Sequence, residues 1–389
     1  MKTDLREKNV SAAETGEDSL NWRYQDKEYN ESYKEWRRRK QDSLGFYFVE
    51  NPNLLTYQDG VGFIKDYPEA HEAKTMQRVL MVLSGMLLFL TAFDIFSSNI
   101  LPLLLERLGA NIHYDFYAKS LYGDYTIILT IRLISGILKR VIPIWFLLKK
   151  FEMPLSVMIP TKITNKPMFK VCVPSMLLVS GVCCVLTYFY EQILSFMHID
   201  TSRASMIPEG GFDLIYFLII QAVIIPIVSE ISIHGVVLQL TRQFGDGTAL
   251  LITSFISASI QYDITKSCYV FVSSLIIGYF VIRTGSVVTA VLMRMTLAAY
   301  TCTVYLLDYR VEHELGLTLT MAFLFLTIMI GLIFTVRFIC SHGDRFGMTI
   351  KPRYLDFGAK LIAIVTNIPM IIWLTLVFIL TLSNIKIMM

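Results

Sequence analysis

The segment IIPIVSEISIHGVVLQLTRQFG, residues 224–245, decides the fold class of this chain and holds its most informative side chains. It belongs to an apolar run long enough for an α-helix that crosses the hydrocarbon core of a bilayer, which takes about 20 residues. Pro226 can bend that helix, and Glu230 and His234 follow it four residues apart, on one helical face. Ionisable groups are costly in lipid, so we expect this pair to face the interior of a helix bundle.

The rest of the chain has the same apolar character. Of its 389 residues, 54% are apolar, and the mean hydropathy is +0.53, which is too high for one soluble core. Apolar segments, two of them short for a span, lie at 79–105, 126–148, 171–197, 212–241, 248–263, 268–283, 285–307, 317–339 and 361–384. The sequence therefore predicts an all-α polytopic membrane helix bundle with about eight or nine transmembrane helices in contact with the lipid bilayer.

Basic residues gather in three polar segments: before the first span, at 149–170 and at 337–360. By the positive-inside rule these segments lie in the cytoplasm. This predicts a multi-pass protein of the cell membrane with a cytoplasmic N-terminus and an external C-terminus, and the clustered charge indicates topology rather than nucleic-acid binding. The predicted parts are a cytoplasmic arm, N-terminal transmembrane helices, a central core and C-terminal transmembrane helices, at residues 1–78, 79–210, 211–310 and 311–389.

The N-terminal arm contains an aromatic pattern beside a basic run. Trp22, Tyr29, Tyr33 and Trp36 recur at helical spacing, next to the basic residues 37–40. An aromatic face beside a cationic cluster is typical of a helix that lies on an anionic membrane surface. A solvated helix or a disordered arm is the alternative.

Further charges lie inside the first two spans. The first span contains Asp94, and the second contains Arg132, Lys139 and Arg140. Intramembrane charges are usually paired or face a hydrated cavity. We expect an ion pair from Asp94 to Arg132 or Arg140 that fixes the packing of the two helices, and we keep a transport role as the alternative.

The partners of Glu230 and His234 must come from later spans, which supply Gln261 and Arg294. Two ligands are too few for a metal site, and neither an amide nor a guanidinium is a good ligand for a divalent cation. A guanidinium beside a buried carboxylate instead forms a bidentate pair. The residues therefore predict a buried Glu230–Arg294 ion pair with His234 and Gln261 as hydrogen-bond neighbours, with no metal and no cofactor.

The order of motifs over residues 212–307 resembles the CPBP family, the membrane-embedded CAAX prenyl endopeptidases and Abi-type bacteriocin-processing proteins. That family has an EExxxR motif after a proline, then FxxxH, a TGS turn and HxxxN. Here the first motif is replaced by residues that keep one glutamate and a glycine, namely Ser229, Glu230, His234 and Gly235. The second falls on Ser257 to Gln261, the turn is Thr284, Gly285 and Ser286, and the third falls on Arg294 to Ala298.

The resemblance implies a CPBP-like core and, in an active member, a first glutamate that activates water together with two histidines and an asparagine. Ser229, Gln261, Arg294 and Ala298 occupy those positions here and make a pseudo-active site, while Glu230 and His234 are the candidate catalytic residues that remain. Loss of a general base or an oxyanion donor costs about 10²-fold or more in rate. The sequence thus favours a bacterial, catalytically silent pseudoenzyme that binds or regulates a membrane-protein or peptide partner.

Two other functions stay open. The first is an active intramembrane endopeptidase that uses Glu230 and His234 on prenylated or leader-type peptides. Ser229 beside His234 is a weak nucleophile candidate, because a serine in a membrane helix usually bonds to its own backbone. The second is a transporter, which the charges of the first two spans suggest.

Overall fold

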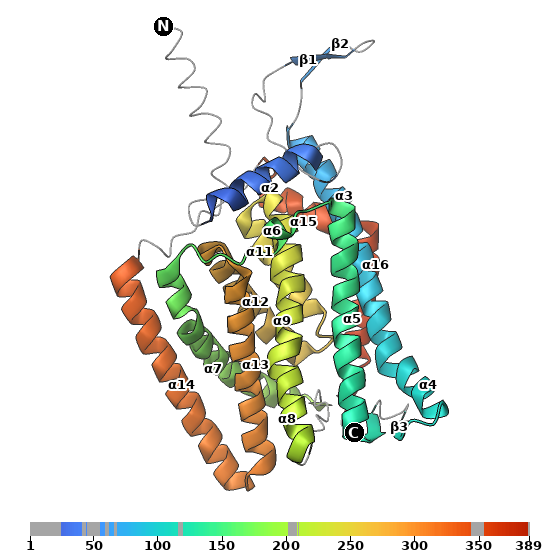
Figure 1. Cartoon of the computed structure of the whole chain (residues 1–389), viewed down its shortest axis with the longest axis vertical. Coiled ribbons are helices and arrows are strands. Elements are labelled where there is room, and N and C mark those ends of the chain that lie inside the picture. Colours follow the sequence, from blue (N-terminus) through green and yellow to red (C-terminus); the bar gives the residue numbers. More distant parts are fainter. Residues whose placement is uncertain are drawn as a thin grey trace.

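The computed structural model describes residues 25–40, 44, 55–58, 62–65, 68–115, 120–200, 208, 210–343 and 354–387. These residues form a bundle of long helices (Figure 1). Its helices are α2 Lys27–Lys40, α3 Pro68–Ile95, η2 Phe96–Ile100, α4 Leu101–Arg107, α5 Tyr125–Phe151, α6 Leu155–Met158, α7 Lys166–Phe196, α8 Gly211–Ile219, η3 Ile220–Ile224, α9 Ile225–Glu230, η4 Ile231–Val237, α10 Leu238–Thr241, η5 Arg242–Phe244, α11 Asp246–Ser259, α12 Ile264–Thr284, α13 Val287–Arg310, α14 His313–His342, α15 Phe357–Val365 and α16 Ile368–Leu382.

Strands are short and peripheral. They form antiparallel two-stranded ribbons: β1 Leu55–Gln58 with β2 Gly62–Lys65, β3 Ile112–Asp115 with β4 Ser120–Gly123, and β5 Ile199–Asp200 with β6 Lys386–Ile387. The last ribbon joins the end of α7 to the segment after α16. The predicted all-α membrane fold is confirmed, because every long element is a helix.

Six of the described helices are long and apolar enough to cross a membrane, or seven if the bent pair α15 and α16 forms one span. The two remaining predicted segments form helices that do not meet this standard. Helix α5 is 27 residues long but carries Arg132, Lys139 and Arg140, and α11 has only 14 residues. At 1.5 Å per residue, α11 is about 21 Å long, shorter than the hydrocarbon core of about 30 Å.

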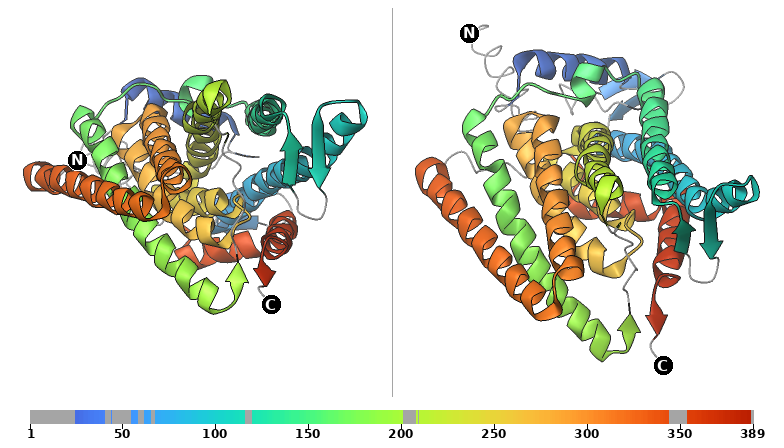
Figure 2. Two further views of the ribbon diagram at one scale, coloured as in Figure 1. Left: turned by 90° about the horizontal axis from the view of Figure 1, so that it is seen from below. Right: turned by 60° about the horizontal axis from the view of Figure 1, so that its bottom comes forward.

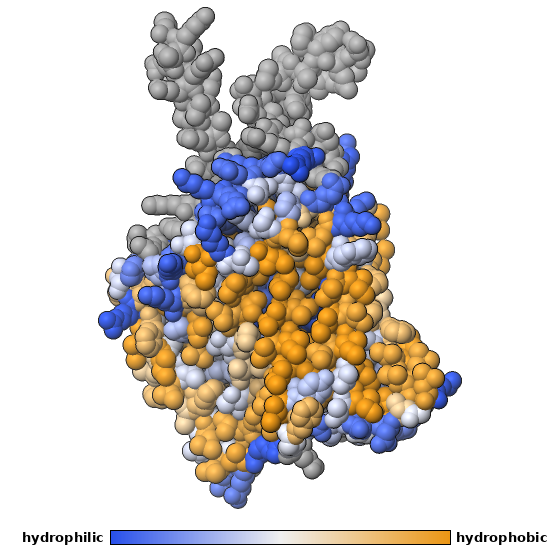
Figure 3. All heavy atoms as spheres, viewed as in Figure 1, coloured by the Kyte–Doolittle hydropathy of each residue, from blue (hydrophilic) through white to orange (hydrophobic). Residues whose placement is uncertain are grey.

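The ends of the bundle differ in polarity. Helices α2, α6 and α15 lie across one end, at the top of Figure 1, where α5 also ends with Lys149 and Lys150. The same view in Figure 3 shows an apolar surface below a hydrophilic rim. Arg345, Lys351 and Arg353 of the predicted basic loop lie outside the described residues. The cytoplasmic location of this end remains a prediction.

The helix from α8 to η5 is central to the candidate site. Seen from below, α9 lies between α13 and α5 (Figure 2), and it packs against both. The site helix is followed by Gly245, after which α11 begins, and a tight turn at Gly285 joins α12 to α13. Gly285 has φ +74°, a left-handed conformation that glycine adopts without a steric penalty. This turn is the TGS sequence that the motif comparison identified.

The aromatic face of the arm packs against protein rather than lipid. Tyr29, Tyr33 and Trp36 of α2 are all buried in the same apolar core as residues of α3, α6 and η4. The indole of Trp36 donates a hydrogen bond of 2.8 Å to the carbonyl oxygen of Phe151. The predicted interfacial helix is therefore wrong for these residues: α2 is a docked part of the bundle. Trp22 lies outside the described residues.

Candidate functional site

The helix that carries Glu230 is continuous from Gly211 to Phe244 but contains two π-helical segments, η3 and η4. A proline inside a helix lacks an N–H donor, and its ring clashes with the carbonyl four residues earlier. The widened turn of η3 ends at Ile224, two residues before Pro226, where it can accommodate the proline ring. The second π segment begins directly after Glu230 and contains His234. Such π segments are frequent at functional sites.

Both oxygens of the Glu230 carboxylate contact a nitrogen. Oε2 contacts Nδ1 of His234, and Oε1 lies 3.4 Å from Nε of Arg294 on α13. The side chains of Glu230 and His234 are only 3% and 1% exposed. The predicted ion pair between Glu230 and Arg294 is thus present, although Arg294 approaches through Nε at a distance longer than the expected bidentate contact.

The imidazole of His234 is held on its other side by α12. Its Nε2 lies 3.1 Å from the carbonyl oxygen of Ser274 and 3.3 Å from Oγ of the same residue. An ionised carboxylate only accepts hydrogen bonds, so Nδ1 donates to Oε2 of Glu230, and Nε2 of a neutral imidazole then accepts from the hydroxyl of Ser274. Gly278 makes this approach possible, because a Cβ there would lie 3.3 Å from Cδ2 of His234 and 2.6 Å from Cδ2 of Leu250.

A small cavity lies beside this pair. It has a volume of about 30 Å³, enough for roughly two water molecules, and residues of α3, α5, α9, η4, α11 and α13 line it. Lys139 and Arg140 of α5 line it together with Arg294 and Glu230. Arg140 donates to the carbonyl oxygen of Gly136 at 2.9 Å, one turn earlier in its own helix.

The predicted ion pair of Asp94 has a different partner. Nζ of Lys139 lies 2.6 Å from Oδ1 of Asp94, whereas the expected partners were Arg132 and Arg140. Arg132 is exposed and does not line the cavity. The prediction was wrong because helix periodicity does not fix how one helix is rotated against its neighbour, and this rotation selects the cation that faces Asp94.

Of the other predicted site residues, Ser229 and Gln261 line the cavity and Ala298 does not. Ser229 lines the cavity, and its hydroxyl donates to the carbonyl oxygen of Pro226 at 3.0 Å, the backbone contact expected for it. Gln261 also lines the cavity, but its amide nitrogen donates to the carbonyl oxygen of Ser257 at 3.2 Å rather than to Glu230. Ala298 lies one turn beyond Arg294 on α13 and is not part of the lining.

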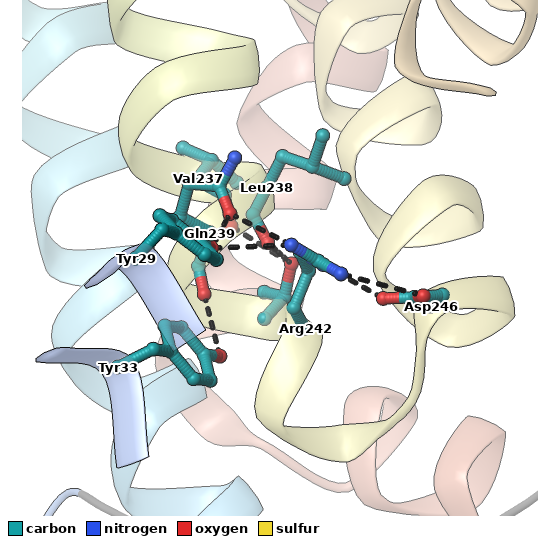
Figure 4. A network of polar contacts seen from close by, with 8 residues as sticks. Tyr29, Tyr33, Val237, Leu238, Gln239, Arg242 and Asp246 are labelled. Atoms are coloured by element: carbon teal, nitrogen blue, oxygen red, sulfur yellow. Dashed lines mark hydrogen bonds and ion pairs between the residues drawn. The ribbon is translucent and has the colours of Figure 1, made fainter. Parts of the chain in front are cut away.

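A second polar cluster lies at the end of the site helix (Figure 4). Nε of Arg242 donates to Oδ1 of Asp246 at 2.7 Å, and both side chains are buried. Tyr29 of the arm donates to Oε1 of Gln239 at 2.5 Å and accepts from Nη1 of Arg242 at 3.1 Å. Tyr33 donates to the carbonyl oxygen of Gln239 at 2.9 Å. This cluster was not predicted from the sequence, although Arg242 and Asp246 carry opposite charges four residues apart, a spacing that brings two side chains together on one helical face.

Burial raises the pKa of Tyr29 far above its ordinary value of 10.0, while the nearby positive charge of Arg242 acts in the opposite direction. The phenol therefore stays neutral and donates its proton to Gln239. The docked arm is joined to the site helix by a hydrogen-bonded network as well as by apolar contact.

The donor set at Glu230 does not fit a divalent metal. Within the part of the chain that the structure describes, no three His, Cys, Asp or Glu side chains gather at one point. Glu230 and His234 offer two ligands, and the permanently charged Arg294 occupies one of the carboxylate oxygens that a cation would need.

Comparison with known protein families identifies the segment that builds this site. Residues 211–300 match the family model described as type II CAAX prenyl endopeptidase Rce1-like. No curated protein and no solved structure matched the chain. The matched range contains Ser229, Glu230, His234, Gln261 and Arg294. Over this range the chain is therefore similar to the type II CAAX prenyl endopeptidases of the CPBP family, as its motifs indicated.

Proposed function

We propose that this CPBP-type membrane protein is catalytically silent and acts as a binding or regulatory scaffold for a membrane-protein or peptide partner. The observation that supports the proposal is the state of Glu230. One carboxylate oxygen contacts His234 and the other contacts Arg294. A general base needs a free lone pair directed at water. With one oxygen against His234 and the other facing the guanidinium of Arg294, neither oxygen of the Glu230 carboxylate is free of a nitrogen partner.

The other positions of the family pattern support the same proposal. Ser229 donates to its own helix backbone, Gln261 donates to the carbonyl oxygen of Ser257 near the end of α11, and Ala298 has no polar side chain. Each lost general base or oxyanion donor lowers the rate by about 10²-fold or more. A scaffold can keep its shape and its ability to bind after such losses, because fold and chemistry are separable.

The proposal includes an orientation. Helix α2, the α5–α7 connection and α15 lie at one end of the bundle, and the basic residues of these segments favour the cytoplasmic side of a cell membrane. The docked helix α2 would then be the surface that a cytoplasmic partner meets first, next to the end of the site helix.

A cleavage assay tests the proposal. The purified protein in neutral detergent is incubated with prenylated CAAX peptides and with leader-type peptides, beside Glu230→Gln and a catalytically active member of the family as the positive control. We expect no turnover above background from either form of this protein. Turnover that Glu230→Gln abolishes would refute catalytic silence.

An active endopeptidase is the second candidate, and one contact favours it. Glu230 and His234 face each other on one helix, as a base and its orienting partner do in hydrolases. The same assay separates the two, with Arg294→Gln as a further variant. If the guanidinium alone suppresses the dyad, this variant gains turnover; we expect it to stay inactive because Ser229, Gln261 and Ala298 remain unsuited to catalysis.

A further inference from the structure

The cavity beside Glu230 carries more positive than negative charge. Its lining contains the cations of Lys139, Arg140 and Arg294 and the carboxylate of Glu230. Asp94, outside the lining, neutralises Lys139 at 2.6 Å, and Glu230 faces Arg294 at 3.4 Å. With His234 left out of the count, three cations thus face two carboxylates.

Arg140 holds the unbalanced charge. Among the described residues, no carboxylate lies within 4.0 Å of its guanidinium, and its one side-chain hydrogen bond goes to the carbonyl oxygen of Gly136. Gly136 lets α5 approach α9 closely, because a Cβ there would lie 2.6 Å from Cδ1 of Ile225. This approach places Arg140 at the cavity wall with donors left for a ligand.

The site is deep in the bundle. Arg140 lies eleven residues before Phe151, the last residue of α5, or about 16 Å along the helix. Glu230 lies about 21 Å before Phe244, where the site helix ends. A guanidinium without a carboxylate in direct contact at this depth is unfavourable in an apolar medium and favours an anion that can form charge-assisted hydrogen bonds with it.

We propose that this cavity binds a single carboxylate carried on an apolar chain, such as that of a long-chain fatty acid. One negative charge matches the excess charge of the lining. A volume of about 30 Å³ admits a small head group in place of roughly two waters. The apolar chain of the ligand accounts for the depth of the site, because it would remain among the apolar side chains over α5 and α9. At mid-height of this apolar face, Figure 3 shows a few hydrophilic atoms. The proposal rests on the proposed function, since it assigns a ligand to the same, catalytically silent site.

The test compares three probes on the full chain in neutral detergent: palmitate, hexadecanol and acetate. We expect palmitate to raise the midpoint of thermal unfolding by several degrees, since a ligand that binds only the folded state stabilises it. Hexadecanol at the same micellar concentration and acetate at millimolar concentration should produce no shift. An equal shift with hexadecanol would show that the charge is irrelevant, and an equal shift with acetate would show binding of any small anion; either result overturns the proposal.

Variants of α5 locate the binding site. Arg140→Gln should weaken palmitate binding by roughly 10-fold or more, since loss of one partner of a desolvated charge pair has at least that effect. Arg140→Lys should retain binding, which keeps the test valid if Arg140→Gln does not fold. Arg132→Gln is the matched control, because Arg132 is exposed on the same helix outside the cavity, and it should bind as the wild type does. Equal loss in Arg132→Gln and Arg140→Gln would refute the assignment.

The peptide-cleavage assay on the same samples separates the two proposals. Palmitate binding together with Glu230-dependent cleavage refutes catalytic silence but leaves the carboxylate site intact. Absence of both palmitate binding and cleavage refutes the carboxylate site and leaves the silent scaffold standing.

Discussion

Substitution of Asp246 by Asn should strongly destabilise the bundle, because it leaves a buried guanidinium without its carboxylate. Arg242 and Asp246 have side chains that are 1% and 0% exposed, with Nε and Oδ1 2.7 Å apart. Removal of one partner from a buried ion pair costs about 3–5 kcal/mol. Arg242 keeps hydrogen bonds to Tyr29 and Gln239 at 3.1 and 3.3 Å, so we take the lower limit, about 3 kcal/mol.

Reversible unfolding in mixed dodecyl maltoside and SDS micelles, followed by circular dichroism, measures this loss. A decrease of about 3 kcal/mol lowers the folding equilibrium constant by roughly 100-fold or more. Glu35→Gln is the matched control: Glu35 and Arg39 form an ion pair at the same helical spacing, with side chains 63% and 70% exposed. Because water screens an exposed pair, this control should leave the free energy of unfolding unchanged.

A double substitution separates charge from packing. Arg242→Met combined with Asp246→Leu removes both charges and replaces them with apolar side chains, so the protein should be no less stable than Asp246→Asn alone. A stabilising role of the buried pair is refuted if Asp246→Asn unfolds at the same SDS fraction as Glu35→Gln. The unpaired guanidinium as the cause of the loss is refuted if the double variant is clearly less stable than the single one.

Three further predictions concern the arm and the site. Trp36→Ala should lower the free energy of unfolding by about 3 kcal/mol and expose the arm to protease, whereas Trp145→Ala, which removes a 62% exposed side chain, should do neither. Burial raises the pKa of Tyr29 in the folded protein above its ordinary value of 10.0, so the phenol ionises first in the unfolded chain. The contribution of Tyr29 to stability is therefore complete below pH 10.0 and is lost as the pH rises further. Tyr29→Phe should flatten this fall in stability, as measured by protease release of the arm. Glu230→Gln should destabilise the fold more than the double variant Glu230→Gln with Arg294→Gln, measured in the same micelles, because the single change leaves Arg294 without its carboxylate; equal effects would contradict the ion pair.

The sequence alone was sufficient for the features that depend on neighbours within one helix. Apolar length predicted the helices, and the four-residue spacing predicted that Glu230 and His234 meet. The return of the Ser229 hydroxyl to the backbone of Pro226 is equally local. The approach of Arg294 to Glu230 spans two helices, and it was predictable because a carboxylate inside a bundle requires a cation and few cations were available.

The tertiary structure decided the features that join distant parts of the chain. Asp94 pairs with Lys139 rather than with Arg132 or Arg140, because the rotation of α5 against α3 selects the cation. Tyr29 reaches Arg242 across 213 positions of sequence. An aromatic helical face is equally suited to a bilayer surface and to a protein groove, since both are apolar beneath a polar boundary. Sequence thus determined which side chains had to leave water, and only the packing of the bundle determined what each of them meets.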